Sequence, residues 1–106
     1  MFLQIQVSVP NKDTGQHIIT HLLEEQLIAC GQLLGPITST YHWEGEIEQS
    51  EEFLCLLKTT KAAYATLQNK IVDLHPYDVP EIIATELVEG YDSYLQWINQ
   101  EVKHME

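Results

Sequence analysis

The sequence predicts a single α+β domain whose elements follow the order β-α-β-β-α-β, the split βαβ plan, with one more helix at the end. Three observations predict this order. Strand-like segments alternate apolar and polar residues, helix-like segments repeat apolar residues every three or four positions, and turn-forming residues separate them. A length of 106 residues fits one domain, 1-106, and 44% hydrophobic residues are enough to form a core.

The first strand is predicted over residues 2–9 and the first helix after Pro10. Asp13 is expected to cap this helix, because Gln16 stands three residues later in a capping-box position. Gly31 is expected just beyond the helix, so that Cys30 would end it. The apolar residues share one face of the strand and one stripe of the helix: Leu3, Ile5, Val7 and Val9, then Ile18, Ile19, Leu22, Leu23 and Leu27.

A long β-hairpin is predicted over residues 33–60, with its turn at 44–46. An arm of about 12 residues spans roughly 40 Å, whereas a helix of ~16 residues covers only about 24 Å. The hairpin should therefore project beyond the helices. Its far part carries large apolar residues, which favours burial against another subunit; a hairpin curled back over its own sheet is the alternative. These residues are Tyr41, Trp43, Ile47 and Phe53.

The second half of the chain predicts two helices and a strand between them. Thr60 is expected to cap the second helix, and His75-Pro76 to end it, because proline cannot continue a helix. The last strand is predicted over residues 82–88 and is ended by Gly90. The third helix is expected to start at Asp92 or Ser93. The apolar stripe of the second helix is expected to consist of Tyr64, Leu67, Ile71 and Leu74. That of the third helix is expected to consist of Tyr94, Trp97, Ile98 and Val102.

The net charge of the chain limits the classes of molecule that it is expected to bind. Five lysines, no arginine and sixteen acidic residues give a formal net charge of −11. Such a surface repels phosphate groups, so nucleic acids and anionic membranes are not expected to bind, whereas cations are attracted. The first ten residues lack the pattern of a secretory signal, and Cys30 and Cys55 form no CxxC pair. We therefore expect a cytoplasmic protein with free thiols, Cys55 being a core residue.

The segment from His75 to Glu81 is the strongest candidate for chemistry. It places an imidazole, a phenol and two carboxylates within seven residues, and two prolines restrict its backbone. His75 can ligate a metal or carry a proton, and Glu81 can ligate or act as a base. The alternative is a rigid connector from helix to strand that takes no part in chemistry.

Three weaker candidates are also present. His42 and Glu44 share one face of the hairpin and can form a surface cation site or simply a polar face. His17 and His21 have the i,i+4 spacing that can bind a transition metal, or they belong to a solvated helix face. Lys58 ends a strand just before a helix, where an anion can bind, although no glycine-rich loop accompanies it.

Four blocks, in this order, resemble the CutA divalent-cation-tolerance family. They are residues 41–48 (YHWEGEIE), 57–60 (LKTT) and 75–81 (HPYDVPE), and then Gly90 followed by 94–98 (YLQWI). The resemblance extends over essentially the whole chain, and four ordered blocks are more specific than any one of them.

The resemblance implies a ferredoxin-like subunit, a homotrimer similar to the PII signalling proteins, and clefts between subunits that bind ligands. It implies a part in tolerance to copper and other divalent cations, with no established enzymatic activity. The residues expected to line such a cleft are Tyr41, Trp43, Lys58, His75, Tyr77 and Glu81. The residues expected to bind a copper or zinc ion are His75, Glu81 and Cys30.

One feature departs from the family pattern. Some relatives carry a further cysteine in the first strand, where this chain has Val7-Ser8. Because Cu(I) favours several sulfur ligands, a metal site built on imidazole and carboxylate is expected here instead. Two other functions remain open at this point: a structural scaffold, and an enzyme that uses His75 and Glu81 as an acid–base pair.

Overall fold

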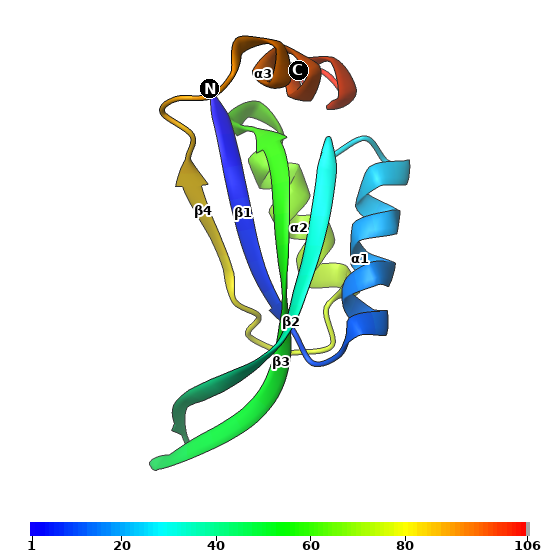
Figure 1. The fold of residues 1–106 in the computed structure, drawn as a ribbon. Helices are drawn as coiled ribbons and strands as arrows, with labels where there is room; N and C mark the ends of the chain where they lie inside the picture. Colours follow the sequence, from blue (N-terminus) through cyan, green and yellow to red (C-terminus); the bar gives the residue numbers. More distant parts are fainter. Residues whose placement is uncertain (106) are drawn as a thin grey trace.

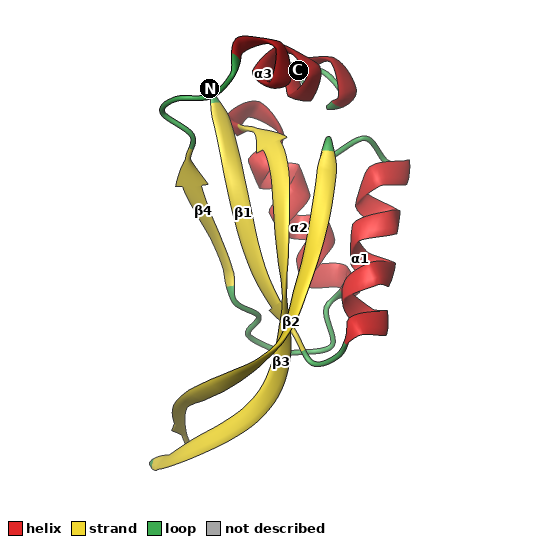
Figure 2. Cartoon of the chain, in the orientation of Figure 1, coloured by secondary structure: helices red, strands yellow, loops and turns green. Residues whose placement is uncertain are grey.

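The computed structural model describes residues 1–105 and confirms the predicted order of elements (Figures 1 and 2). The elements are β1 (Phe2–Val9), α1 (Lys12–Glu24), β2 (Cys30–Trp43), β3 (Glu46–Thr60), a 3-10 turn (Lys61–Ala63), α2 (Tyr64–Leu74), β4 (Ile82–Glu86) and α3 (Asp92–Glu101). Among these residues, no helix has the length and apolarity needed to cross a membrane.

The four strands form one antiparallel sheet in the order β2-β3-β1-β4. Helices α1 and α2 lie behind the sheet in Figure 1, and α3 lies across one end of it. The other face carries no helix, and we call it the open face. Side chains alternate along the strands, so the open face carries Gln4, Gln6, Gln32, Leu34, Leu54, Leu56, Lys58 and Ile83.

The main core lies between the sheet and the two covering helices. Leu3, Ile5, Val7 and Val9 of β1 are at most 8% exposed, and the core residues of α1 and α2 that face them are at most 3% exposed: Ile18, Ile19, Leu22, Leu67 and Ile71. Gly15 lets α1 approach the sheet closely, because a Cβ atom at this position would lie 2.6 Å from Leu33 Cδ1. A smaller cluster holds α3 through Ile98 and Val102.

The ends of α1 differ from the sequence prediction. Asn11 is the N-cap, accepting a hydrogen bond from the Thr14 N–H at 2.8 Å, so the predicted cap at Asp13 is wrong. The helix ends at Glu24 rather than near Gly31 because Gln26 adopts the left-handed conformation, with φ of 57°. The N–H groups of Gln26 and Leu27 bond back to the previous turn, as in a Schellman motif. Cys30 therefore begins β2 instead of ending the helix.

Later boundaries are partly as predicted. Thr60 caps the turn into α2 through the Ala63 N–H, and α2 ends at Leu74, before the predicted stop at His75-Pro76. β4 ends at Glu86 and not at Val88. The cap of α3 is Tyr91, which makes no side-chain bond, so the predicted cap at Asp92 or Ser93 is wrong.

The hairpin of β2 and β3 projects from the sheet, as predicted (Figure 1). Its pairing with β1 ends at Phe53, so residues 37–52 form a two-stranded ribbon that we call the arm. Glu44 and Gly45 form the turn with φ of 50° and 81°, the positive values that a type I′ hairpin turn requires. Near the tip, Trp43 is 60% exposed and Ile47 is 71% exposed, so the arm does not curl back over its own sheet.

Candidate functional site

His75 lies at the C-terminal end of α2, beside the root of the arm, and only 7% of it is exposed. Its Nε2 donates to the Ser8 carbonyl oxygen at 2.7 Å, and its Nδ1 accepts from the Tyr77 N–H at 3.1 Å. A carbonyl can only accept and an amide N–H can only donate, so these partners fix the neutral Nε2–H tautomer. Both ring nitrogens are therefore occupied within one chain.

Tyr77 connects this imidazole to a buried carboxylate. Its hydroxyl donates to Glu52 Oε2 at 2.8 Å, and its ring centroid lies 4.8 Å from that of His75. Glu52 is only 8% exposed. Burial, followed by the effect of the Glu52 carboxylate, raises the pKa of the Tyr77 phenol to about 12. The phenol is thus a proton donor held in place over the arm.

Tyr41 approaches the same place from the arm itself. Its hydroxyl donates to Ser50 Oγ at 3.2 Å, and it also contributes to raising the pKa of Tyr77. We call Tyr41, Glu52, His75 and Tyr77 the arm-root cluster. Three of its members were predicted from the sequence, and Glu52 was missed. Period-two alternation already put Glu52 on the face of Leu54 and Leu56, the one signal that pointed to it.

Glu81 lies just before β4. Its Oε2 accepts from the Gln6 side-chain amide at 3.0 Å, which holds the carboxylate against the open face beside β1. It therefore does not share a hydrogen bond with His75. An acid–base pair would require His75 and Glu81 to face one another, with one imidazole nitrogen free to take or give a proton. Both nitrogens of His75 are hydrogen-bonded within the chain, which argues against such a pair.

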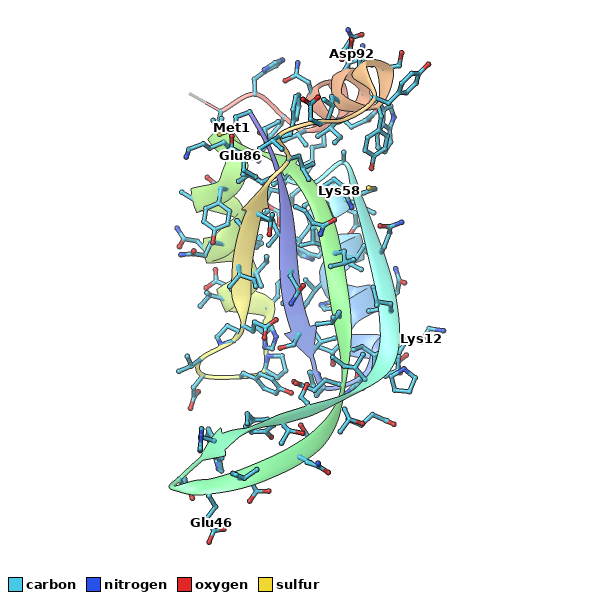
Figure 3. The ribbon with its side chains drawn as sticks, turned by 60° about the vertical axis from the view of Figure 1, so that its left-hand side comes forward. Met1, Lys12, Glu46, Lys58, Glu86 and Asp92 are labelled. Atoms are coloured by element: carbon cyan, nitrogen blue, oxygen red, sulfur yellow. The ribbon has the colours of Figure 1, made fainter. Side chains whose placement is uncertain are left out.

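The remaining predicted residues lie elsewhere. Lys58 is opposite Gln4 on β1, four residues from Ser8 or about 13 Å along the strand, and donates to Gln32 Oε1 at 3.4 Å. Trp43 pairs with Glu46, and Figure 3 shows Glu46 and Lys58 toward opposite ends of the hairpin. A single chain therefore does not bring the six predicted cleft residues to one point.

Cys30 is also separated from the other two predicted metal ligands. It pairs with Lys58 at the α3 end of β2, and its Sγ lies 3.5 Å from the Tyr94 hydroxyl. This contact, followed by burial, raises the pKa of Tyr94 to about 12. Within residues 1–105, no three or more histidine, cysteine or acidic side chains gather as a metal site. Cys55 is fully buried, as predicted, and burial raises the pKa of its thiol to about 11.

Two hollows lie at the α3 end of the sheet. The larger, about 430 Å³, lies between Phe2 and one side of α3, from Asp92 to Gln100. A smaller one, about 200 Å³, lies near Lys61 and Lys103. Neither contains a residue of the arm-root cluster, Glu81 or Lys58, so these hollows are not the predicted cleft.

Comparison with known proteins gives a consistent family. Residues 3–101 match the model of the family described as "CutA1 divalent ion tolerance protein". The chain is 38% identical over 96 residues to "Divalent-cation tolerance protein CutA" of Thermus thermophilus, covering 91% of this chain and 93% of that protein. It is 33% identical over 100 residues to "Protein CutA, chloroplastic" of Arabidopsis thaliana, of which it spans 55%.

The fold agrees with the sequence comparison. The solved structure of "Divalent cation tolerance protein (Cut A1)" from Thermus thermophilus superposes with a TM-score of 0.95 at 37% identity, covering 97% of this chain and 100% of that one. The likeness therefore extends over the sheet, the arm and all three helices.

Proposed function

Because the chain belongs to the CutA1 divalent ion tolerance family, we propose that it works as a homotrimer of ferredoxin-like subunits that binds a divalent cation or a small ligand in clefts between subunits. This is a PII-like binding or signalling role, with copper or zinc as the first cations to test. The proposal gives no residue a catalytic role.

The main support for this proposal is that a single chain exposes large apolar side chains to solvent. Trp43 and Ile47 are exposed on the arm, and Leu34 (43%) and Ile83 (52%) are exposed on the open face. A two-stranded ribbon and a bare sheet face of this composition are liabilities in water. Packing against sister chains buries both at once, because the arm continues the open face beyond the helices.

The positions of the expected cleft residues also support the proposal. These residues are spread over the arm (Tyr41, Trp43), the open face (Lys58, Glu81) and the connector after α2 (Tyr77), too far apart to form one pocket within a subunit. If the arm docks on the next subunit, Tyr41 and Trp43 of one chain come close to Lys58 and Glu81 of another. The clefts are then shared by two chains.

A cation in such a cleft is expected to bind first to carboxylate oxygen. Glu81 lies at the open face, and Glu52 is already held by Tyr77. His75 joins the ligands only if its ring gives up the Ser8 carbonyl or the Tyr77 N–H. Cys30 joins only across a subunit boundary, because it lies at the other end of the sheet in its own chain.

The first experiment measures assembly. Light scattering on the purified protein should give the mass of three chains. In a Trp97→Phe background, the emission of Trp43 should lie at the short wavelengths typical of a buried indole, although Trp43 is 60% exposed in one chain. A folded monomer with solvent-exposed Trp43 would refute the proposal.

The second experiment measures binding. Calorimetric titration of the assembled protein with Cu²⁺, Zn²⁺ and a panel of metabolites should show at least one saturable site. Glu81→Gln should weaken it, whereas Glu89→Gln, a change at an exposed acidic residue, should not. The absence of saturable binding to the trimer would count against a binding role.

One observation favours a second candidate, a structural scaffold. Both ring nitrogens of His75 are used inside the chain, as a rigid connector requires. In that case His75→Ala lowers the melting temperature and leaves ligand binding unchanged. A His75→Ala variant that folds but loses binding supports the cleft instead.

We place the protein in the cytoplasm within the same proposal. Cys30 is half-buried and Cys55 buried, and both are free thiols, as suits a reducing compartment. The net charge of −11 disfavours nucleic acid and anionic membranes as partners. Cell fractionation tests the location directly.

A further inference from the structure

Two imidazoles lie side by side on the outer face of α1, the side of the helix turned away from the sheet. His17 and His21 are four residues apart, so their side chains occupy the same face one turn apart. Their ring centroids are 6.1 Å apart. The opposite face of the helix is fixed in the core by three buried residues: Ile18, Ile19 and Leu22.

Carboxylates extend this row at both ends. Asp13, His17, His21 and Glu25 follow one another at intervals of four residues. Glu25 Oε2 lies 3.0 Å from His21 Nε2 and 3.0 Å from Lys70 Nζ. The Glu25 oxygen that faces His21 is therefore shared with the Lys70 ammonium, which a bound metal ion has to displace.

These distances are close to those of ligands on one metal ion. Two ligand atoms bound to the same Zn²⁺ at about 2.1 Å lie roughly 3–3.4 Å apart, and the His21 nitrogen and the Glu25 oxygen are 3.0 Å apart. Two imidazoles sharing a tetrahedral ion have ring centroids about 5 Å apart. Within residues 1–105 the three side chains do not gather as a metal site, so His17 has to turn its exposed side chain to reach the same ion.

We propose that His17 and His21, with Glu25 as a third ligand, form a site for a divalent transition-metal ion on the outer face of α1. Water completes the coordination. Imidazole ligands select Cu²⁺, Ni²⁺ or Zn²⁺ over Mg²⁺ and Ca²⁺, which prefer oxygen ligands. The negative charge of the chain raises the concentration of cations near the surface.

This site is independent of the proposed clefts. All three ligands come from one chain, and α1 covers the face of the sheet opposite to the open face (Figure 1). It holds metal whether the protein is a monomer or a trimer. Glu81 and the arm-root cluster take no part in it.

The test uses untagged full-length protein and Cu²⁺. Calorimetry should show one site per chain that is lost in the His17→Gln/His21→Gln variant and weakened at least about tenfold in each single variant, since losing a direct ligand costs no less than losing an outer partner. Paramagnetic resonance of the bound Cu²⁺ should show two imidazole nitrogens in the wild type and one in each single variant. Glu25→Gln should weaken the site without changing the nitrogen count.

The matched control is His42→Gln, which removes an exposed imidazole from the arm and should leave this site unchanged. Because the substituted histidines are exposed or half-exposed, the histidine variants should melt like the wild type without metal. Retention of the site in the double variant, or a single imidazole on the wild-type copper, would overturn the proposal. If copper binding is lost in Glu81→Gln but kept in the double histidine variant, only the proposed cleft binds the metal. If it is kept in Glu81→Gln but lost in the double variant, only the site on α1 does.

Discussion

Replacing Tyr77 by phenylalanine tests the arm-root cluster with the loss of one hydroxyl. The change leaves the ring against His75 and removes the 2.8 Å hydrogen bond to Glu52. A hydrogen bond to a charged group contributes about 1.5–3 kcal/mol, and a buried carboxylate left without its donor also loses its solvation. Glu52 is 8% exposed, so water does not readily replace the phenol. We expect Tyr77→Phe to lower the free energy of unfolding by about 2 kcal/mol.

Urea unfolding measures this loss, and all variants are compared at one protein concentration so that any effect of association on stability is the same for each. The second half of a double-mutant cycle is Glu52→Ala, after which Tyr77→Phe should cost much less. A loss below about 0.5 kcal/mol in the wild-type background, within the range of an ordinary surface substitution, would refute the reasoning. So would an equal loss with and without Glu52.

Alkaline pH provides a second measure of the same contact. The pKa of Tyr77 is raised from 10.0 to about 12, so the folded state favours the protonated phenol. Its contribution is complete below pH 10 and is lost as the pH rises through about 12. Tyr94 and Cys55 titrate in neighbouring ranges, so the informative quantity is the difference between wild type and Tyr77→Phe. That difference should shrink above pH 10.

Three further predictions concern the helix ends and the thiols. Gln26→Gly should stabilise the protein by about 0.5–1 kcal/mol, because glycine adopts the left-handed conformation without strain; Gln26→Ala should not, and thermal melting compares them. Asn11→Ala should cost about 1 kcal/mol in the same assay, whereas Asp13→Ala should cost less, since only Asn11 caps α1. Cys55 should resist alkylation until the protein unfolds, because it is fully buried with a pKa of about 11, and an equally fast reaction in the native state would contradict this burial.

The parts of the fold that depend on local pattern were predictable from the sequence. The alternation of apolar and polar residues over 2–9 predicted β1 and its buried face. Pro76 predicted the end of α2, and the structure confirms both. The end of α1 was not predictable in the same way. A left-handed residue is usually glycine or asparagine, so the sequence pointed to Gly31, whereas Gln26 adopts that conformation in the structure.

The candidate site was predictable only where one segment contains it. His75, Tyr77 and Glu81 stand within seven residues, and the chemistry of that segment is plain from the sequence. Glu52 is 25 residues from Tyr77, and an acidic residue beside Glu51 looks like part of a solvated strand. Its burial depends on the connector after α2 lying over the root of the arm, a tertiary contact that no local pattern encodes.

The arm has a thermodynamic consequence for the chain as a whole. Residues 37–52 pair only with each other, and an isolated two-stranded ribbon is marginally stable in water. In a lone chain, the amide hydrogens of the arm should therefore exchange with solvent well before those of β1. Tyr41 and Trp43 belong to this weakest unit. If the chains associate through the arm as proposed, local order at these aromatic rings and association form one linked equilibrium, and dilution should weaken ligand binding before it unfolds the rest of the protein.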